Sequence, residues 1–487
     1  MNRAILFLLI SSLFICFSAK ANIHPKIKQE LDQKIQNLFP NAHVGLVIQH
    51  LEKNQLIYAK KPNQYFFPAS TIKLLTSYAA LNYLGSEYTY QTTLQFDPKK
   101  INSAGRLKGD MILAFNGDPS LTDEKLEQLL LSLKEHGVKQ IQGKIYIEGQ
   151  GYALPYAPPG ATWDVWSYYP PVSSIILNEN TVSVKLQPST QLYEPCGVNF
   201  VQPENYTLTH QITTVSEKEA EQSCSLDVTV DTNNAIHLSG CWPINQPDTM
   251  MTISLASPEK MAEQKIKTLL KKHAIQYPNQ AVYFTHADAS SKAKLNTMAS
   301  VSSLPLPSLI KTMLHDSNNL YADSLHKKLG QTYFDKGGYA QGVMAQQAIL
   351  TKLAVPLERN QQFDGSGASR YNLLTPNQLV TLLTKVYQDK KNYPILLQAL
   401  PVAGTSGTLK NRFQEKSTRI CQNKIHAKTG SLRYISALAG YLSVSPEQQY
   451  AFALMIQGEP NKMKKIKQKE DVLMAEIYQL LAENLKK

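Results

Sequence analysis

Strand-like segments at both ends of this 487-residue chain constrain its fold more than any other feature. Two lie near the start and three near the end, and each set stands beside a helical pattern, over residues 22–39 and 471–485. The five segments are residues 44–48, 55–59, 424–431, 436–444 and 450–457. The sequence therefore predicts one sheet assembled from the two ends of the chain, with the middle as an excursion from it.

The middle of the chain has a different texture. Between about residues 89 and 288, short alternating strand patterns recur, as at 110–114 and 182–186, and turn residues separate them. Only residues 122–136 look clearly helical. We predict an inserted, mostly-β module, with two lobes. The predicted division is residues 22–88 and 289–487 for one discontinuous domain and 89–288 for the insertion.

Residues 1–21 are typical of a secretory signal peptide. A cationic start at Asn2-Arg3 precedes the apolar run 4–17, and Ala19-Lys20-Ala21 supplies the small residues that a signal peptidase requires. An uncleaved anchor is the alternative, but the apolar run is short for a membrane span. No later segment reaches the roughly 18 uninterrupted apolar residues of a span. We expect an exported, periplasmic protein, soluble or loosely associated with the membrane.

Export makes disulfides possible, and four cysteines follow the signal. Cys224 and Cys241 terminate two strand patterns that can pair antiparallel across a turn at 231–234. A hairpin symmetric about their midpoint places the two residues opposite each other, at a Cα separation of about 4.5–5.5 Å, which suits a disulfide. We predict a Cys224–Cys241 bond, with two buried free thiols as the alternative. Cys196 and Cys421 fall in different predicted domains and should be unpaired.

The formal net charge of +12 is spread along the chain, apart from a lysine cluster near the C-terminus. An anionic cell-wall polymer fits this charge in an exported protein better than a nucleic acid does, although solubility alone would also account for it. The cluster precedes an apolar helix face, a pattern that can lie on an anionic membrane. Burying that face against the sheet would contribute roughly 6–12 kcal/mol, so we predict a docked helix with at most weak peripheral membrane contact. The cluster is Lys462, Lys464, Lys465, Lys467 and Lys469, and the face is Leu473, Ile477, Leu480 and Leu481.

Ser70 and Lys73 have the spacing of a serine nucleophile and its base. A serine hydroxyl needs a base within hydrogen-bond reach, and residues three apart share one face of a helix, here predicted from residue 71 to 84. Burial and a second cation, for which Lys428 is the candidate, would lower the lysine pKa. The Ser70 N–H at the helix N-terminus would also donate to an oxyanion. Taken alone, an N-cap serine followed by an exposed lysine is the simpler interpretation.

Two further motifs overturn that simpler interpretation. Ser317-Asn318-Asn319 and Lys428-Thr429-Gly430 follow in the order of the signature set of penicillin-binding proteins and class A β-lactamases. Six longer stretches carry the match: 68–73, 117–122, 317–320, 364–376, 404–409 and 426–432. The chain resembles the low-molecular-weight class C penicillin-binding proteins, the D-alanyl-D-alanine carboxypeptidase/endopeptidases, over essentially its whole mature length. It departs at Asn318, where the usual pattern has Asp.

The resemblance implies an α/β (α+β) transpeptidase-like domain, with a five-stranded antiparallel sheet between helices and with the insertion after the first motif. It also implies roles for the motif residues. Ser70 would be the acylated nucleophile and Lys73 its general base. Ser317 would relay protons, and Asn319 would bind the amide carbonyl of the substrate.

The third motif would lie on the strand that edges the cleft. Lys428 would hold positive charge near the terminal carboxylate of the substrate. Thr429 and Ser431 would hydrogen-bond that carboxylate or the reacting carbonyl, and the Ser431 N–H would be the second oxyanion donor. Gly430 would be required because a side chain there would block a close backbone approach.

Arg370 and Asp164 are weaker candidates for substrate binding. The resemblance matches Arg370 to an arginine that contacts the substrate side chain, and a surface salt bridge is the alternative. Asp164 would meet the free amine of the peptide's diamino acid, although a loop-capping role is favoured. The aromatic residues around it would pack between lobes rather than stack on a sugar. They are Trp163, Trp166, Tyr168 and Tyr169.

Two histidines near the motifs, His315 and His426, suggest a Ser-His arrangement, but no third partner of a triad is evident. We expect His426 to pack beside the site. No histidine spacing indicates a metal site, and we expect no cofactor.

The sequence thus predicts an exported serine-type D-alanyl-D-alanine carboxypeptidase and DD-endopeptidase. It would act on peptidoglycan stem peptides and cross-links through an acyl-enzyme, and β-lactam antibiotics would inhibit it covalently. A β-lactamase-like hydrolase and a catalytically inactive cell-wall-binding protein are the alternatives. The large insertion argues against the first, and the complete motifs argue against the second.

Overall fold

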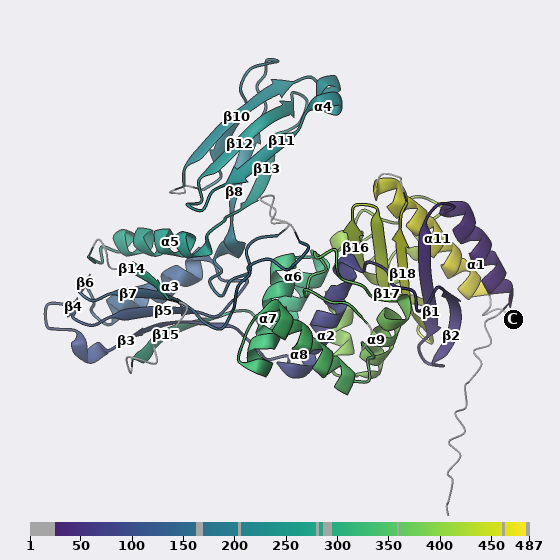
Figure 1. The fold of residues 1–487 in the computed structure, drawn as a ribbon, viewed down its shortest axis with the longest axis horizontal. Helices are drawn as coiled ribbons and strands as arrows, with labels where there is room; N and C mark the ends of the chain where they lie inside the picture. Colours follow the sequence, from purple (N-terminus) through teal and green to yellow (C-terminus); the bar gives the residue numbers. More distant parts are fainter. Residues whose placement is uncertain are drawn as a thin grey trace, which may run out of the picture.

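The computed structural model describes residues 25–161, 169–202, 206–278, 282–285, 295–357, 360–459 and 463–483. The predicted signal peptide and Asp164, with Trp163, Trp166 and Tyr168, lie outside these residues. Figure 1 shows a part with a sheet between helices, in which the two ends of the described chain lie side by side, and a second part rich in strands.

The first part is built on one antiparallel sheet with the strand order β16-β17-β18-β1-β2. Strand β1 near the start of the chain pairs with β18 near its end, from His43 opposite Gln457 to His50 opposite Tyr450. The prediction of one five-stranded sheet made from both ends is confirmed. The strands are β1 (His43–His50), β2 (Gln55–Lys60), β16 (Ile425–Leu432), β17 (Ile435–Ser445) and β18 (Gln448–Gln457).

Helices cover both faces of this sheet, and the two faces differ in side-chain size. Ala437 and Ala439 of β17 face one helical layer, whereas Leu438 between them faces the other. Small residues on the first face let helices approach the sheet closely. That layer contains α2 (Lys73–Tyr83), α6 (Leu306–His315), α7 (Asn319–Phe334), α8 (Tyr339–Lys352), α9 (Pro376–Gln388) and α10 (Tyr393–Ala399). The opposite layer contains α1 (Pro25–Leu38) and α11 (Met463–Glu483).

The inserted part has two lobes, as predicted (Figure 1). One lobe holds the five-stranded sheet β14-β7-β5-β3-β15 and the pair β4–β6, and the other holds the sheets β13-β8-β9 and β10-β12-β11. Its strands are β3 (Gln91–Phe96), β4 (Arg106–Leu107), β5 (Met111–Phe115), β6 (Gln140–Ile141), β7 (Ile145–Gly149), β8 (Thr181–Gln187), β9 (Gly197–Phe200), β10 (Leu208–Val215), β11 (Leu226–Val230), β12 (Ile236–Pro243), β13 (Thr249–Ser254), β14 (Val282–Thr285) and β15 (Asn296–Ser302).

The order of these strands along the chain makes the second lobe an insertion within the first. Strands β3 to β7 belong to the first lobe, β8 to β13 to the second, and β14 and β15 return to the first. Because β15 pairs with β3, the sheet of the first lobe extends to Ser302. The division at residues 88 and 289 stays a prediction. The pairing of β15 with β3 favours a later boundary, with the chain leaving the insertion after Ser302.

The expectation that only residues 122–136 of the insertion are helical is wrong. Besides α3 (Asp123–Glu135), the insertion contains α4 (Glu217–Ser223) and α5 (Pro258–Lys272). Helix α5 carried a recognisable signal: Ser257 caps it by accepting a hydrogen bond from the Lys260 N–H, and Pro258 occupies its first turn. Its apolar face is buried on the core of the insertion. These buried apolar residues recur at the helical period, so this signal was also present in the sequence.

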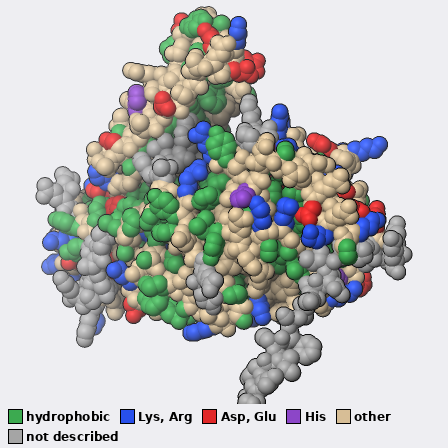
Figure 2. Space-filling view, turned by 45° about the vertical axis from the view of Figure 1, so that its right-hand side comes forward, with side chains coloured by type: hydrophobic (Ala, Val, Ile, Leu, Met, Phe, Trp, Pro, Cys, Tyr) green, Lys and Arg blue, Asp and Glu red, His purple; other side chains and the backbone are tan. Residues whose placement is uncertain are grey.

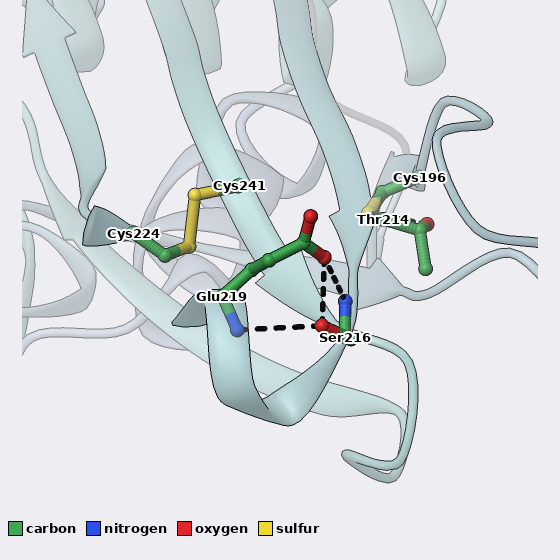
Figure 3. The surroundings of a disulfide bond; sticks show 6 residues. All are labelled: Cys196, Thr214, Ser216, Glu219, Cys224 and Cys241. Carbon is green, nitrogen blue, oxygen red and sulfur yellow. Dashed lines mark hydrogen bonds between the residues drawn. A yellow bond between two sulfur atoms is a disulfide. The ribbon is translucent and has the colours of Figure 1, made fainter. Parts of the chain in front are cut away.

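Cys224 and Cys241 form a disulfide that joins the end of α4 to β12 (Figure 3), with a Cα–Cα distance of 5.5 Å. The predicted register, however, is wrong by one residue. Leu226 pairs with Gly240, so the hairpin is centred on Asn233 rather than on the midpoint of the two cysteines. Beside the bond, Gly240 has φ +111°, and a Cβ there would lie 2.0 Å from the Ser225 carbonyl oxygen, so glycine lets the two segments approach closely. Cys196 and Cys421 are buried and unbonded, as expected.

Helix α11 is docked and begins at Met463, before the predicted start at residue 471. Leu473, Ile477, Leu480 and Leu481 are all at least 94% buried, in one core with α1 and the sheet. Within the described part of the chain, no helix is long and apolar enough to cross a membrane. On the face seen in Figure 2, Lys and Arg side chains are scattered among acidic and apolar ones.

Truncation after Gln468 should unfold or aggregate the protein. The four buried residues of α11 contribute very roughly 6–12 kcal/mol by burial, which is comparable to the whole stability of a typical domain. Thermal unfolding and size-exclusion chromatography measure the effect, with truncation after Glu483 as the matched control. A Gln468 truncation that stays folded, active and merely released from membranes would reverse the docked assignment.

Candidate active site

Ser70 and Lys73 lie on the turn that leads into α2. The expected helix begins later than predicted, because residues Ala69–Ile72 form a 3₁₀ turn and α2 starts at Lys73. The tighter turn keeps the two side chains together, with Lys73 Nζ 3.0 Å from Ser70 Oγ. Ala69, directly before the serine, has φ +44°. A non-glycine residue in this region is strained, and such strain is concentrated at functional sites.

The Lys73 ammonium is fully buried and held by three acceptors. Besides Ser70 Oγ, it donates to Asn319 Oδ1 at 2.7 Å and to the Ser366 carbonyl at 2.6 Å. Burial lowers the pKa of Lys73 to about 8, against the opposing charges of Asp323 and Asp364. A lysine with this pKa is partly neutral near pH 8, as a general base must be.

Lys428 stands beside this pair and contacts the serine of the second motif. Its Nζ is 2.8 Å from Ser317 Oγ and 2.8 Å from the Thr429 carbonyl. Burial, and then the charges of Lys73 and Lys467, lower the pKa of Lys428 well below its usual range. Of the two causes that the sequence suggested for a lowered Lys73 pKa, burial and the charge of Lys428, burial is the main one.

The third motif lies on β16, the edge strand of the sheet. Gly430 meets a close backbone approach there, as expected from the sequence. A Cβ at this position would lie 2.7 Å from the Pro68 carbonyl and 3.1 Å from the Ala69 Cβ. The close approach is therefore to the segment that carries Ser70, and glycine lets β16 pack directly against that turn.

These elements enclose an open pocket of about 550 Å³. Residues of all three motifs line it, together with Arg370 and residues of the insertion. The lining includes Ser70, Ser317, Asn319, Thr429, Ser431, Arg370, Gly160, Ala161 and Tyr169. The pocket thus lies between the part of the molecule that carries the three motifs and the insertion, and its volume suits a short peptide terminus.

The histidines near the motifs do not line this pocket. His426 lines a separate hollow with Tyr393 and Tyr441. His315 bonds to Asp316 through its Nδ1 at 2.8 Å. Within the described residues, no group of three or more His, Cys, Asp or Glu side chains could hold a metal ion.

Comparison with known proteins identifies the family. Residues 27–477 match the D-Ala-D-Ala carboxypeptidase 3 (S13) family. The chain belongs to this family. The D-alanyl-D-alanine carboxypeptidase DacB of Haemophilus influenzae is 27% identical over 426 residues, which cover 87% of each chain.

Solved structures agree with this assignment. The crystal structure of penicillin binding protein 4 (dacB) from Haemophilus influenzae is 26% identical, with a TM-score of 0.83, and covers 92% of this chain and 99% of that chain. A structure of the same protein complexed with a β-lactam matches over the same shares at 26% identity, with a TM-score of 0.77. The predicted family, fold and class of enzyme are confirmed: the chain is a serine-type D-alanyl-D-alanine carboxypeptidase by family.

Two buried carboxylates support the site of this S13 protein, and the sequence analysis missed both roles. Asp323 accepts from the Gly365 N–H at 2.7 Å and from the Tyr169 hydroxyl at 2.5 Å. Asp364 accepts from the Ser369 N–H at 2.6 Å and the Gly367 N–H at 2.8 Å. Burial and the nearby charge of Asp323 raise the pKa of Asp364.

These bonds fix the loop whose Ser366 carbonyl accepts from Lys73. Gly367 packs so tightly against Ala69 that a Cβ there would lie 1.9 Å from the Ala69 carbonyl oxygen. The glycines and small polar residues of the 364–376 stretch were the available sequence signal. The segment that they contact, around Ala69, lies far away in the sequence, so the local pattern did not predict it.

The departure at Asn318 has a structural explanation. Asn318 Oδ1 caps α7 by accepting from the Tyr321 N–H, and its Nδ2 donates to Glu179 Oε2 at 2.8 Å. Glu179 comes from the insertion, in a left-handed turn in which residues 178, 179 and 180 all have φ between 46° and 56°. An aspartate at 318 would keep the cap but would face the Glu179 carboxylate, so Asn suits this chain.

Asn318→Asp should therefore impair this protein although it produces the S-D-N form of the motif. We expect a stability loss of about 1–3 kcal/mol from the lost donor and the facing carboxylates, with slower penicillin acylation because Ser317 and Asn319 flank the change. Thermal unfolding and labelling kinetics measure the two effects. Adding Glu179→Gln should restore both, because glutamine can donate to the new aspartate. A double variant as impaired as Asn318→Asp alone would contradict the pairing.

Penicillin acylation should follow the ionisation of Lys73. Its rate should rise about tenfold per pH unit below pH 8 and level off above, because only the neutral amine accepts the Ser70 proton. Lys73→Arg should lose at least about 100-fold, since a guanidinium does not deprotonate. Rapid-quench labelling across the pH range tests this, with circular dichroism as the folding control. A flat profile from about pH 6 to 9 would count against Lys73 as the base.

Proposed function

We propose that this protein is a periplasmic serine carboxypeptidase and DD-endopeptidase that cleaves D-Ala-D-Ala termini and peptide cross-links of peptidoglycan. The observation that carries the proposal is the 3.0 Å contact between the buried Lys73 ammonium and Ser70 Oγ in a peptide-sized pocket. A serine beside a lysine with a pKa of about 8 is equipped for nucleophilic attack at neutral to mildly alkaline pH.

Acylation begins when neutral Lys73 takes the Ser70 proton. The Ser70 oxygen attacks the carbonyl of the penultimate D-Ala, and the backbone N–H groups of Ser70 and Ser431 stabilise the oxyanion. The C–N bond then breaks, and the leaving amine receives a proton through Ser317, which hydrogen-bonds Lys428. The leaving group is D-Ala in the carboxypeptidase reaction and the amine of the second peptide in the endopeptidase reaction.

Deacylation reverses these proton movements with water as the nucleophile. Water attacks the ester carbonyl and gives up a proton to Lys73, and Ser70 regains its own as the ester bond breaks. A β-lactam would acylate Ser70 in the same way, but its leaving nitrogen stays tethered to the acyl group. The β-lactam complex of the Haemophilus influenzae relative supports this class of inhibitor.

The remaining pocket residues would bind the peptide. Asn319, on the first turn of α7, would donate to the substrate's amide carbonyl, and the hydroxyls of Thr429 and Ser431 would bind the carboxylate. Arg370 is exposed and lines the pocket, which suits contact with the substrate side chain. Asp164 lies outside the described residues, and its contact with the substrate amine stays a prediction.

The compartment and partners follow from the same chemistry. The predicted signal peptide and the peptidoglycan substrate both favour the periplasm, with weak electrostatic contact to the membrane at most. The β-lactamase alternative is disfavoured by the match to the carboxypeptidase family over residues 27–477. The inactive-scaffold alternative is disfavoured because Lys73 contacts Ser70 at 3.0 Å and Lys428 contacts Ser317 at 2.8 Å, so both serine–lysine pairs are in place.

A fluorescent penicillin separates the three functions. We expect stable covalent labelling together with release of D-Ala from a pentapeptide, and loss of both in Ser70→Ala. This variant should keep its fold, because Lys73 retains its other two acceptors and the loss of one hydrogen bond costs about 1 kcal/mol. Rapid turnover of the label would indicate a β-lactamase, no labelling of the wild type would indicate a scaffold, and labelling of Ser70→Ala would refute the mechanism.

A further inference from the structure

One lysine of the C-terminal cluster does not face a membrane but lines the active-site pocket. Lys467 lies on α11 and borders the pocket with Thr408, Thr429 and Ser431. Its charge contributes to the lowered pKa of Lys428, in keeping with its place beside Thr429 of β16. Helix α11 thus brings a residue from near the end of the chain to the edge-strand side of the pocket.

The backbone that carries Lys467 is fixed. Ile466 before it is buried in the core below the sheet. One helical turn further on, Glu470 and Asp471 are held by Arg412, at 3.1 Å for Arg412 Nη2 to Glu470 Oε2 and 2.7 Å for Arg412 Nε to Asp471 Oδ1. An ammonium on such a helix loses less freedom on binding than one on a mobile surface.

Lys467 also supplies a charge that Lys428 is poorly placed to supply. Lys428 is completely buried and donates to Ser317 and to the Thr429 carbonyl. Lys467 is half-buried, and in the described part of the chain its ammonium makes no hydrogen bond or ion pair within 4 Å. Among the described residues that line the pocket, the basic side chains are Arg370 and Lys467.

We propose that Lys467 binds the carboxylate of the residue that leaves, so that it selects substrates with a free carboxylate next to the scissile bond. The proposal rests on the proposed function, in which Thr429 and Ser431 bind the same carboxylate as neutral donors. Lys467 adds the positive charge to this group. A leaving amine without a neighbouring carboxylate would not gain the contact, so Lys467 would discriminate among cross-links by their chemistry.

A purely structural role makes a different prediction. Burial and the charge of Arg412 lower the pKa of Lys467, against the opposing charges of Glu470 and Asp471. In that role the ammonium balances two carboxylates that share one guanidinium, and its loss would lower stability and act equally on every substrate.

The test compares two peptides that differ only at the C-terminus, an acyl-D-Ala-D-Ala with a free carboxylate and its C-terminal amide. For Lys467→Gln we expect kcat/KM on the free acid to fall about tenfold, mainly through KM, and to change little on the amide. Lys467→Arg should retain most of the preference for the acid. Lys465→Gln is the matched control, because Lys465 is exposed on the same helix and does not line the pocket.

An equal loss on both peptides, or no change in either, would overturn the assignment of Lys467 while leaving the proposed function intact. A wild type that hydrolyses neither peptide would overturn both. Should Lys467→Gln fail to fold, Lys467→Met keeps the length of the side chain without its charge and should show the same selective loss on the acid. A Lys467→Met variant with an unchanged ratio of the two kcat/KM values would refute the proposal.

Discussion

The burial of two lysine ammonium groups is the constraint on which this active site depends. An ammonium removed from water must find acceptors, or it carries a large desolvation penalty. Lys73 has three acceptors, which come from the turn before α2, from α7 and from the 364–376 loop. Lys428 joins β16 to the segment between α6 and α7. The two lysines therefore tie together segments that are far apart in the sequence, and the same burial that requires these contacts lowers the pKa of Lys73 into the useful range.

The insertion takes part in the site rather than standing apart from it. Its Tyr169 donates to Asp323 behind the Lys73 loop, and its Glu179 accepts from Asn318 in the second motif. Lys327 on α7 fastens the same region, since its ammonium donates to the carbonyls of Ala153, Pro155 and Val172 at 2.8–3.0 Å. A module that is inserted between the first two motifs thus returns to brace both of them, and it contributes one wall of the pocket.

Helix α11 combines a structural and a chemical task. Its apolar face covers the sheet opposite α2, while Lys467 on another face borders the pocket. From composition alone, the lysine cluster suggested a positively charged surface that could contact a membrane. The helix geometry divides it, because Lys464 and Lys465 are exposed, Lys469 pairs with Glu459, and Lys467 turns toward β16.

The sequence by itself determined the elements with a strong local signature: the motifs, the sheet made from both ends, the β-rich insertion and the apolar face of α11. Periodicity and motif spacing are patterns among neighbouring residues, so they can be recognised in a single sequence. Only the tertiary structure decided what those residues meet. Each of the following contacts involves a partner from a distant segment or another strand register: the Cys224–Cys241 bond across its offset, the packing of Gly430 on Pro68, the pairing of Asn318 with Glu179, and the approach of Lys467 to β16. Such contacts depend on how layers stack and strands align, and the pattern of neighbouring residues does not specify that alignment.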